Sequence, residues 1–248
     1  MVSYRTSARS ALVSWIRRLA LVVLLVVVAL AIIVAVLWPL TPSVSDAWRR
    51  VHAEVAPQHG RVTHRLPRPD RVGRAVIATE NSRFYLEPGV DPLGLVRAAE
   101  GLVLHRNLGA ATLEQQLAKR LYTPSASGIG SEVEDVELSF KLDATYPKRE
   151  ILAMYLSDVY FGHGYYGVDA AAEGYFGRRP AQLSWAQAAL LAGLLQSPAG
   201  YDPYRHPRAA KGRQRHVLDR LVSTDVLSSA QARAASNVPW HLEPTAPA

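Results

Sequence analysis

Two stretches of similar pattern decide the fold class: residues 112–122 read TLEQQLAKRLY and residues 184–195 read SWAQAALLAGLL. Each begins with a hydroxyl residue that is followed three positions later by Gln. This is the spacing of a capping box, in which two side chains satisfy the free N–H groups at the start of a helix. Each stretch continues into apolar residues at helical spacing. The two stretches therefore predict helices in a mainly α protein.

Further helices are predicted on both sides of these stretches. Residues 72–79 keep apolar positions at helical spacing, Asp91-Pro92 is suited to open a helix that runs to His105, and Pro147 is suited to start another. Residues 122–130 (YTPSASGIG) predict a loop. No stretch alternates convincingly between apolar and polar residues, so we expect no substantial sheet.

An apolar run near the start predicts a membrane anchor. Residues 19–40 (LALVVLLVVVALAIIVAVLWPL) carry no charge and are long enough to cross a bilayer. A signal peptide is the alternative, but its apolar part is usually shorter and ends at small residues. Four Arg precede the run and no acidic residue does, which favours a cytoplasmic N-terminus and an exported domain. We expect a cytoplasmic segment (1–18), a transmembrane helix (19–40), a stalk (41–69), a globular domain (70–236) and a tail (237–248).

The charge balance indicates a membrane rather than a nucleic acid as partner. The net charge is +7, but 24 basic and 21 acidic residues follow position 40, so the exported part is only weakly basic. We therefore expect no nucleic acid, and anionic lipid headgroups beside the anchor are the better-motivated partner. The absence of Cys excludes disulfides and thiol chemistry.

Few short motifs suggest chemistry. Gly162–Gly167 (GHGYYG) fits a dinucleotide-binding string, but a helical stretch precedes it where that motif needs a strand. The chain holds no HExxH zinc motif, no P-loop and no Ser-x-x-Lys. Glu80 falls four residues after Val76, at the edge of an apolar helix face, where burial would raise its pKa and suit a general base. A surface Glu that pairs with Arg83 is the alternative.

Several longer stretches, in order, resemble the signatures of glycosyltransferase family 51, the peptidoglycan glycosyltransferases. Residues 80–91 (ENSRFYLEPGVD) resemble the first signature, Glu-Asp-x-x-Phe-x-x-His-x-Gly-x-Asp. Residues 109–119 (GAATLEQQLAK) resemble the second, Gly-x-Ser-Thr-Ile-Thr-Gln-Gln-Leu-x-Lys. Residues 150–168 and 183–203 resemble the fourth and fifth. The resemblance extends from about residue 70 to about residue 222.

The resemblance implies a lysozyme-like helical domain that polymerises lipid II into glycan strands, with inversion and release of undecaprenyl pyrophosphate. Its partners would be lipid II, nascent peptidoglycan, the cytoplasmic membrane and cell-wall synthases. By residue match, Glu80 would be the catalytic base and Asp135 the second carboxylate. Substrate contacts would come from Phe84, Asp91, Arg97, Thr112, Gln115, Gln116, Lys119, Tyr155 and Gly162.

The chain departs from the family pattern at positions that carry charge. Asn81 and Glu87 stand where the first signature has Asp and His, and Ala111 and Glu114 stand where the second has Ser and Thr. Placed without gaps, the third signature, Arg-Lys-x-x-Glu, falls on residues 131–135 (SEVED). A divalent cation (Mg²⁺ or Mn²⁺) held by Asp135 and Glu132 could restore the lost positive charge. The alternative is that acidic residues here follow the ordinary preference of a helix start.

Three functions stay open from the sequence. The first is an active, divergent peptidoglycan glycosyltransferase, which requires Glu80. The second is a degenerate domain that binds lipid II, glycan or a cell-wall synthase without turnover. The third is a lysozyme-like hydrolase, which would need two carboxylates on either side of a glycosidic bond.

Overall fold

The computed structural model describes residues 38–58, 60–68, 70–91, 94 and 111–244, with isolated positions between 15 and 36. The chain divides into two compact units, residues 1–42 and 43–248. Within the described residues of the larger unit, the regular elements are helices: α2 (Ala47–Val55), η1 (Ala56–Gln58), α3 (Arg71–Glu80), α5 (Leu113–Tyr122), α6 (Ile129–Thr145), α7 (Lys148–Asp158), α8 (Val168–Phe176), η2 (Pro180–Gln182), α9 (Trp185–Leu194), α10 (Pro207–Ser223) and α11 (Ser229–Asn237).

The mainly α prediction is confirmed. An isolated bridge between Tyr160 and Tyr166 is the β pairing found in the described part of the chain. Both predicted capping boxes are present: the Gln115 N–H donates to Thr112 Oγ1 at 3.1 Å, and the Gln187 N–H donates to Ser184 Oγ at 3.3 Å. Local spacing therefore located these helix starts correctly.

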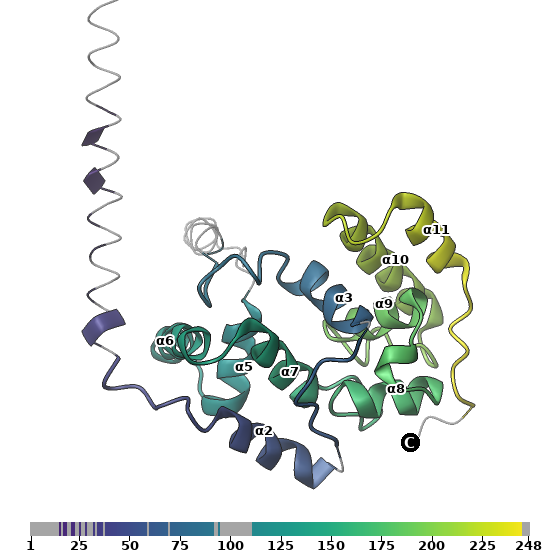
Figure 1. Ribbon diagram of the computed structural model, residues 1–248, viewed down its shortest axis with the longest axis horizontal. Coiled ribbons are helices and arrows are strands. Elements are labelled where there is room, and N and C mark those ends of the chain that lie inside the picture. Colours follow the sequence, from purple (N-terminus) through teal and green to yellow (C-terminus); the bar gives the residue numbers. More distant parts are fainter. Residues whose placement is uncertain are drawn as a thin grey trace, which may run out of the picture. The chain divides into compact units, whose positions relative to one another are not determined.

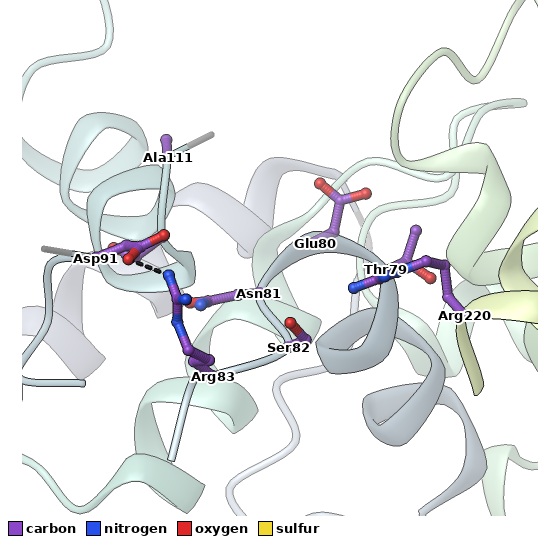
Figure 2. A pocket seen from close by; sticks show the side chains of 9 residues that line it. Thr79, Glu80, Asn81, Ser82, Arg83, Asp91, Ala111 and Arg220 are labelled. Carbon is purple, nitrogen blue, oxygen red and sulfur yellow. Dashed lines mark hydrogen bonds and ion pairs between the residues drawn. The ribbon is translucent and has the colours of Figure 1, made fainter. Parts of the chain in front are cut away.

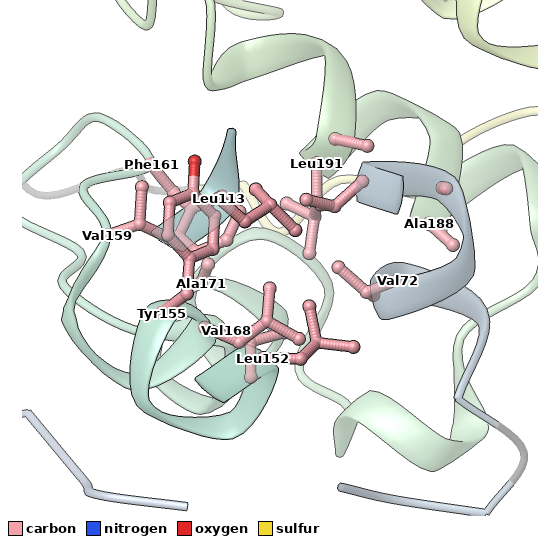
Figure 3. Close-up of a cluster of buried hydrophobic side chains, with 14 of the residues drawn as sticks. Val72, Leu113, Leu152, Tyr155, Val159, Phe161, Val168, Ala171, Ala188 and Leu191 are labelled. Atoms are coloured by element: carbon pink, nitrogen blue, oxygen red, sulfur yellow. The ribbon is translucent and has the colours of Figure 1, made fainter. Parts of the chain in front are cut away.

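The helices form two groups that share one core. Helices α2, α5, α6 and α7 contact one another, as do α3, α9, α10 and α11 (Figure 1). Side chains from α3, α5, α7 and α9 meet where the groups join, as Figure 3 shows for Val72, Leu113, Leu152 and Leu191. Helix α9 is buried at every position from 186 to 194, which explains its almost uniformly apolar sequence.

Residues 41–69 do not form a stalk that is separate from the domain, because α2 packs into the domain core. Ala47, Val51 and Val55 are buried in the core. The Arg50 guanidinium donates to the Leu121 carbonyl at 3.0 Å, and the Tyr146 hydroxyl donates to the Val44 carbonyl at 2.9 Å. The stripe at positions 47, 51 and 55 is helical, but it is narrow and lies among charged residues, so composition concealed it.

The tail also packs on the domain. Gln187 Nε2 donates to the Trp240 carbonyl at 2.9 Å, and the Glu243 N–H donates to the Tyr175 carbonyl at 2.9 Å. Residues 240–243 are thus tied to α9 and α8.

Two predicted elements fall largely outside the described residues. These are the helix expected from Asp91 to His105 and the anchor expected over residues 19–40. Among the helices that the described residues make up, none has the length and apolar character needed to span a bilayer.

Val51→Ala tests whether α2 belongs to the folded domain. Val51 is fully buried, so removing two methyl groups should lower the free energy of unfolding by about 2 kcal/mol. Denaturant unfolding followed by circular dichroism measures this. The control Glu54→Ala, on the exposed face of α2, should change stability by less than about 0.5 kcal/mol. Equal stability of both variants would show that α2 is not part of the cooperative unit.

Candidate functional site

Glu80 is the last residue of α3, and its carboxylate points into a cavity of about 250 Å³ (Figure 2). Helix α3 ends here because Asn81 leaves the helical backbone conformation, with φ −151° and ψ 70°. The chain then turns tightly, and the fully buried Phe84 ties the turn to the core. The residues that line the cavity are Thr79, Glu80, Asn81, Ser82, Arg83, Asp91, Ala111, Thr112 and Arg220.

The environment of Glu80 favours a proton acceptor. Its side chain is 21% exposed, and burial raises the pKa of its carboxyl group. Two weaker effects lower that pKa: the Arg213 guanidinium, with Nη2 3.6 Å from Oε1, and a hydrogen bond from Gln116. Arg83 is not the partner of Glu80, because it forms ion pairs with Asp91 and with Glu87.

The start of α5 forms another wall of the cavity. The Thr112 hydroxyl donates to the Gly89 carbonyl at 2.6 Å, which ties α5 to the loop that carries Asp91. Gly89 has a φ of +75°, and a Cβ there would lie 2.5 Å from the Ser139 carbonyl oxygen. Only glycine therefore suits this close approach.

The two glutamines of the second signature have different surroundings. The Gln115 side chain accepts the Thr112 N–H at 2.9 Å and completes the capping box. Gln116 Oε1 accepts the Tyr155 hydroxyl at 2.9 Å, and its Nε2 donates to the Ala111 carbonyl at 3.2 Å. Its polar side chain beside Glu80 lowers the pKa of that carboxyl group. Gln116 and buried Tyr155 thus support the Glu80 carboxylate, whereas Gln115 holds the helix start.

Two of the residues that depart from the family pattern contact each other. Asn81 Nδ2 donates to Glu87 Oε1, and Asn81 Oδ1 accepts the Leu113 N–H at 3.1 Å. Both side chains are buried. A pair of Asp and His, as the family pattern has, would be acidic at position 81 and basic at position 87. This chain instead has a neutral amide that donates to a carboxylate.

Lys148, at the start of α7, joins this pair to Glu114. Its Nζ donates to the Glu87 carbonyl at 2.7 Å and to Glu114 Oε1 at 2.6 Å, and it lies 2.7 Å from Asp143 Oδ1. It also lies 4.9 Å from the centre of the Phe84 ring. Glu114 is fully buried; burial raises its pKa, and Lys148 opposes that rise. Glu114, which departs from the family signature, therefore forms an ion pair with Lys148 inside the domain.

The predicted cation site is a different place. Asp135 accepts a hydrogen bond from Thr123, and burial raises its pKa, an effect that Lys119 opposes and Glu132 reinforces. Lys119, Glu132 and Asp135 are absent from the described lining of the Glu80 cavity. No group of three or more His, Asp or Glu side chains suited to a metal occurs among the described residues. The divalent-cation site at Asp135 and Glu132 therefore stays a prediction.

The remaining predicted residues fall into three groups: those outside the described residues, those away from the Glu80 cavity, and those that line it. Arg97 is outside the described residues. Gly162 lies in the loop between α7 and α8, with φ +93°, and a Cβ there would be 3.0 Å from the Tyr175 hydroxyl. This loop does not lie between a strand and a helix, so the dinucleotide interpretation is not supported. Asp91 and Thr112 line the cavity, and Phe84 is fully buried in the core.

Sequence reasoning missed two cations of α10. Arg213 pairs with Glu80, and Arg220, which lines the cavity, donates through Nε to the Ala78 carbonyl at 3.0 Å. Helix α10 carries four Arg between residues 208 and 220, and nothing in their spacing marks the two that face α3.

Comparison with known proteins now decides the family. A family model described as Transglycosylase matches residues 50–222. The chain belongs to the transglycosylase family. This match starts inside α2 and ends near the end of α10, so it covers both helical groups.

The relatives of this transglycosylase domain include proteins much longer than the matched region and one protein that the match nearly covers. Penicillin-binding protein 1A of Aquifex aeolicus is 38% identical over 175 residues, which are 69% of this chain and 24% of that protein. Penicillin-binding protein 1A of Neisseria gonorrhoeae is 36% identical over 177 residues, 71% of this chain and 22% of that protein. A protein of Cupriavidus necator named as a transglycosylase is 35% identical over 70% of this chain and 76% of its own length. The chain thus spans about a quarter of the penicillin-binding proteins that it matches.

Lys148→Met tests the buried ion pair of this transglycosylase domain. Without the ammonium group, Glu114 is buried without a cation, which should lower the free energy of unfolding by about 3–5 kcal/mol at pH 8. The folded-state pKa of Glu114 would rise further above its unfolded value. The loss of free energy of unfolding should therefore become smaller as the pH falls toward 5, because protonation of Glu114 removes the buried charge.

Chemical unfolding at pH 5, 6.5 and 8 measures the effect, and Lys148→Met with Glu114→Gln is the matched control. The double variant should be more stable at pH 8 than Lys148→Met alone. A pH-independent loss that is the same in both variants would contradict the ion pair.

Proposed function

We propose that the domain is a peptidoglycan glycosyltransferase with a lysozyme-like arrangement of helices, which polymerises lipid II into glycan strands. The observation that carries the proposal is the position of Glu80: a partly buried carboxylate at a helix end, directed into a cavity and held by Gln116 and Arg213. The relation to penicillin-binding protein 1A supports the substrate class.

In the proposed reaction, Glu80 accepts the proton of a sugar 4-hydroxyl. The hydroxyl oxygen forms a bond to the anomeric carbon of the donor, and the bond from that carbon to the pyrophosphate oxygen breaks with inversion. Undecaprenyl pyrophosphate leaves with the electron pair. Arg220, which lines the cavity, is the cation that we assign to the developing negative charge. Lys119, which lies beside Asp135 and outside the cavity lining, stays a predicted phosphate contact.

The buried contacts tie the departing residues to the walls of the Glu80 cavity. Asn81 joins the Glu87 carboxylate to the Leu113 N–H, and Lys148 donates to the Glu87 carbonyl and to Glu114 Oε1. Among the described residues, Glu87 Oε2 and Glu114 Oε2 are buried without a hydrogen-bond partner, so the set is satisfied only in part.

Glu80→Gln tests the base. The amide keeps the size of the side chain but cannot accept the proton, so polymerisation of labelled lipid II should fall by about 10²–10⁴-fold while binding of lipid II persists. The matched control is Glu173→Gln, because Glu173 is exposed on α8 and its ion pair with Arg61 is at the surface. Equal activity of the two variants would remove Glu80 as the base. Binding without polymer in the wild-type chain would favour the degenerate domain.

Arg213→Gln tests whether Arg213 lowers the pKa of Glu80. The guanidinium lowers the pKa of Glu80, so its removal should raise that pKa. Because the base acts only when ionised, the acidic limb of the pH–rate profile should move to higher pH, with a smaller change well above it. The control is Arg208→Gln, an exposed position on the same helix. A shift to lower pH would contradict the assigned contact.

We propose further that residues 19–40 anchor the chain in the cytoplasmic membrane, with the N-terminus inside and the domain outside. The apolar run and the Arg that precede it support this topology. It would place the domain at the leaflet that holds lipid II and beside cell-wall synthases.

A reporter that is active only after export, fused after residue 248, should be active in this topology. The same reporter fused after residue 18 should be inactive. The reverse pattern would overturn the orientation.

A further inference from the structure

A second concave surface carries five arginines. Two adjoining cavities of about 640 and 510 Å³ share Arg68 and Arg149 in their walls. Arg71 and Arg74 of α3 add to the first cavity and Arg65 to the second. We call this surface the arginine groove. It shares no lining residue with the Glu80 cavity.

The arginines outnumber the acids in the groove, and both acids already have partners. Asp70 accepts the Gly73 N–H at 2.8 Å as the cap of α3, and Glu150 accepts Trp48 Nε1–H at 3.4 Å. Asp70 and Glu150 are the carboxylates in the described walls. The groove therefore has an excess of three positive charges.

Four of the five guanidinium groups lack a close ion-pair partner, although Arg149 and Arg74 lie near enough to Asp70 to oppose the rise in its pKa that burial causes. Arg65, Arg68, Arg74 and Arg149 are exposed and form no ion pair within 4.0 Å with any residue that the structure describes. Arg71 is held in place: Nη1 donates to the Leu183 carbonyl at 3.2 Å, and its guanidinium carbon lies 5.9 Å from the centre of the Trp185 ring.

The chemistry of the walls favours phosphate. The planar guanidinium donates two parallel hydrogen bonds to phosphate oxygens, and several Arg along one groove suit more than one such group. Tyr85, which is 53% exposed, and Trp185 add aromatic surface to the same wall. We propose that the arginine groove binds an anion that carries two or more phosphate groups.

Calorimetric titration of the full chain, in a neutral detergent, with tripolyphosphate tests the proposal. Arg74→Gln with Arg149→Gln should weaken binding at least about 10-fold, because charge-assisted hydrogen bonds are lost at two positions. The matched control is Arg178→Gln with Arg208→Gln, which removes two exposed positive charges elsewhere and should change affinity less than about twofold.

Other probes separate the alternatives. Citrate, with three carboxylates, should bind more weakly than tripolyphosphate, and equal affinity would overturn the preference for phosphate. Absence of tripolyphosphate binding, or equal loss in both double variants, would overturn the site. Binding to phosphatidylglycerol vesicles without binding to tripolyphosphate would assign the arginines to a membrane surface and would likewise overturn the proposal.

Discussion

The ammonium group of Lys148 is the contact on which the surroundings of the Glu80 cavity depend. It reaches from α7 to the Glu87 carbonyl in the loop after α3 and to the fully buried Glu114 of α5. It also lies against the Phe84 ring, which anchors that loop in the core. The Lys148 side chain, which is 19% exposed, satisfies acceptors on two separate segments, and its loss would leave the Glu114 carboxylate buried without a cation.

This arrangement changes the meaning of the departures from the family pattern. Asn81 and Glu87 are not independent losses, since Asn81 donates to the Glu87 carboxylate, and Glu114 pairs with Lys148, which also holds the backbone carbonyl of residue 87. The set holds the turn directly after Glu80 and the start of α5, which are two walls of the cavity. The charge pattern differs from that of the family signatures, while Gln116 and Tyr155 contact each other beside the proposed base.

The sequence predicted what depends on local spacing. The capping boxes at Thr112 and Ser184 and the partial burial of Glu80 follow from residues within one helical turn of each other. It could not predict contacts between distant segments: Lys148 is 34 positions from Glu114, and Arg213 lies on a helix more than 100 positions after Glu80. A stalk with at most one short helix was expected over residues 41–69, and the burial of α2 was not predicted for a related reason, because its narrow apolar stripe at Val51 is completed only by packing on α5 and α7.

The central claim is that the unusual residues compensate one another around an active Glu80, and lipid II polymerisation by two variants tests it most directly. Asn81→Asp restores the family residue but places a second carboxylate against buried Glu87, so the rate should fall by about 10-fold or more. Adding Glu87→His restores the opposite charge, and the account predicts recovery to within a few-fold of the wild-type rate. A single variant that is as active as the wild-type chain or more active, with no further gain from Glu87→His, would contradict the account.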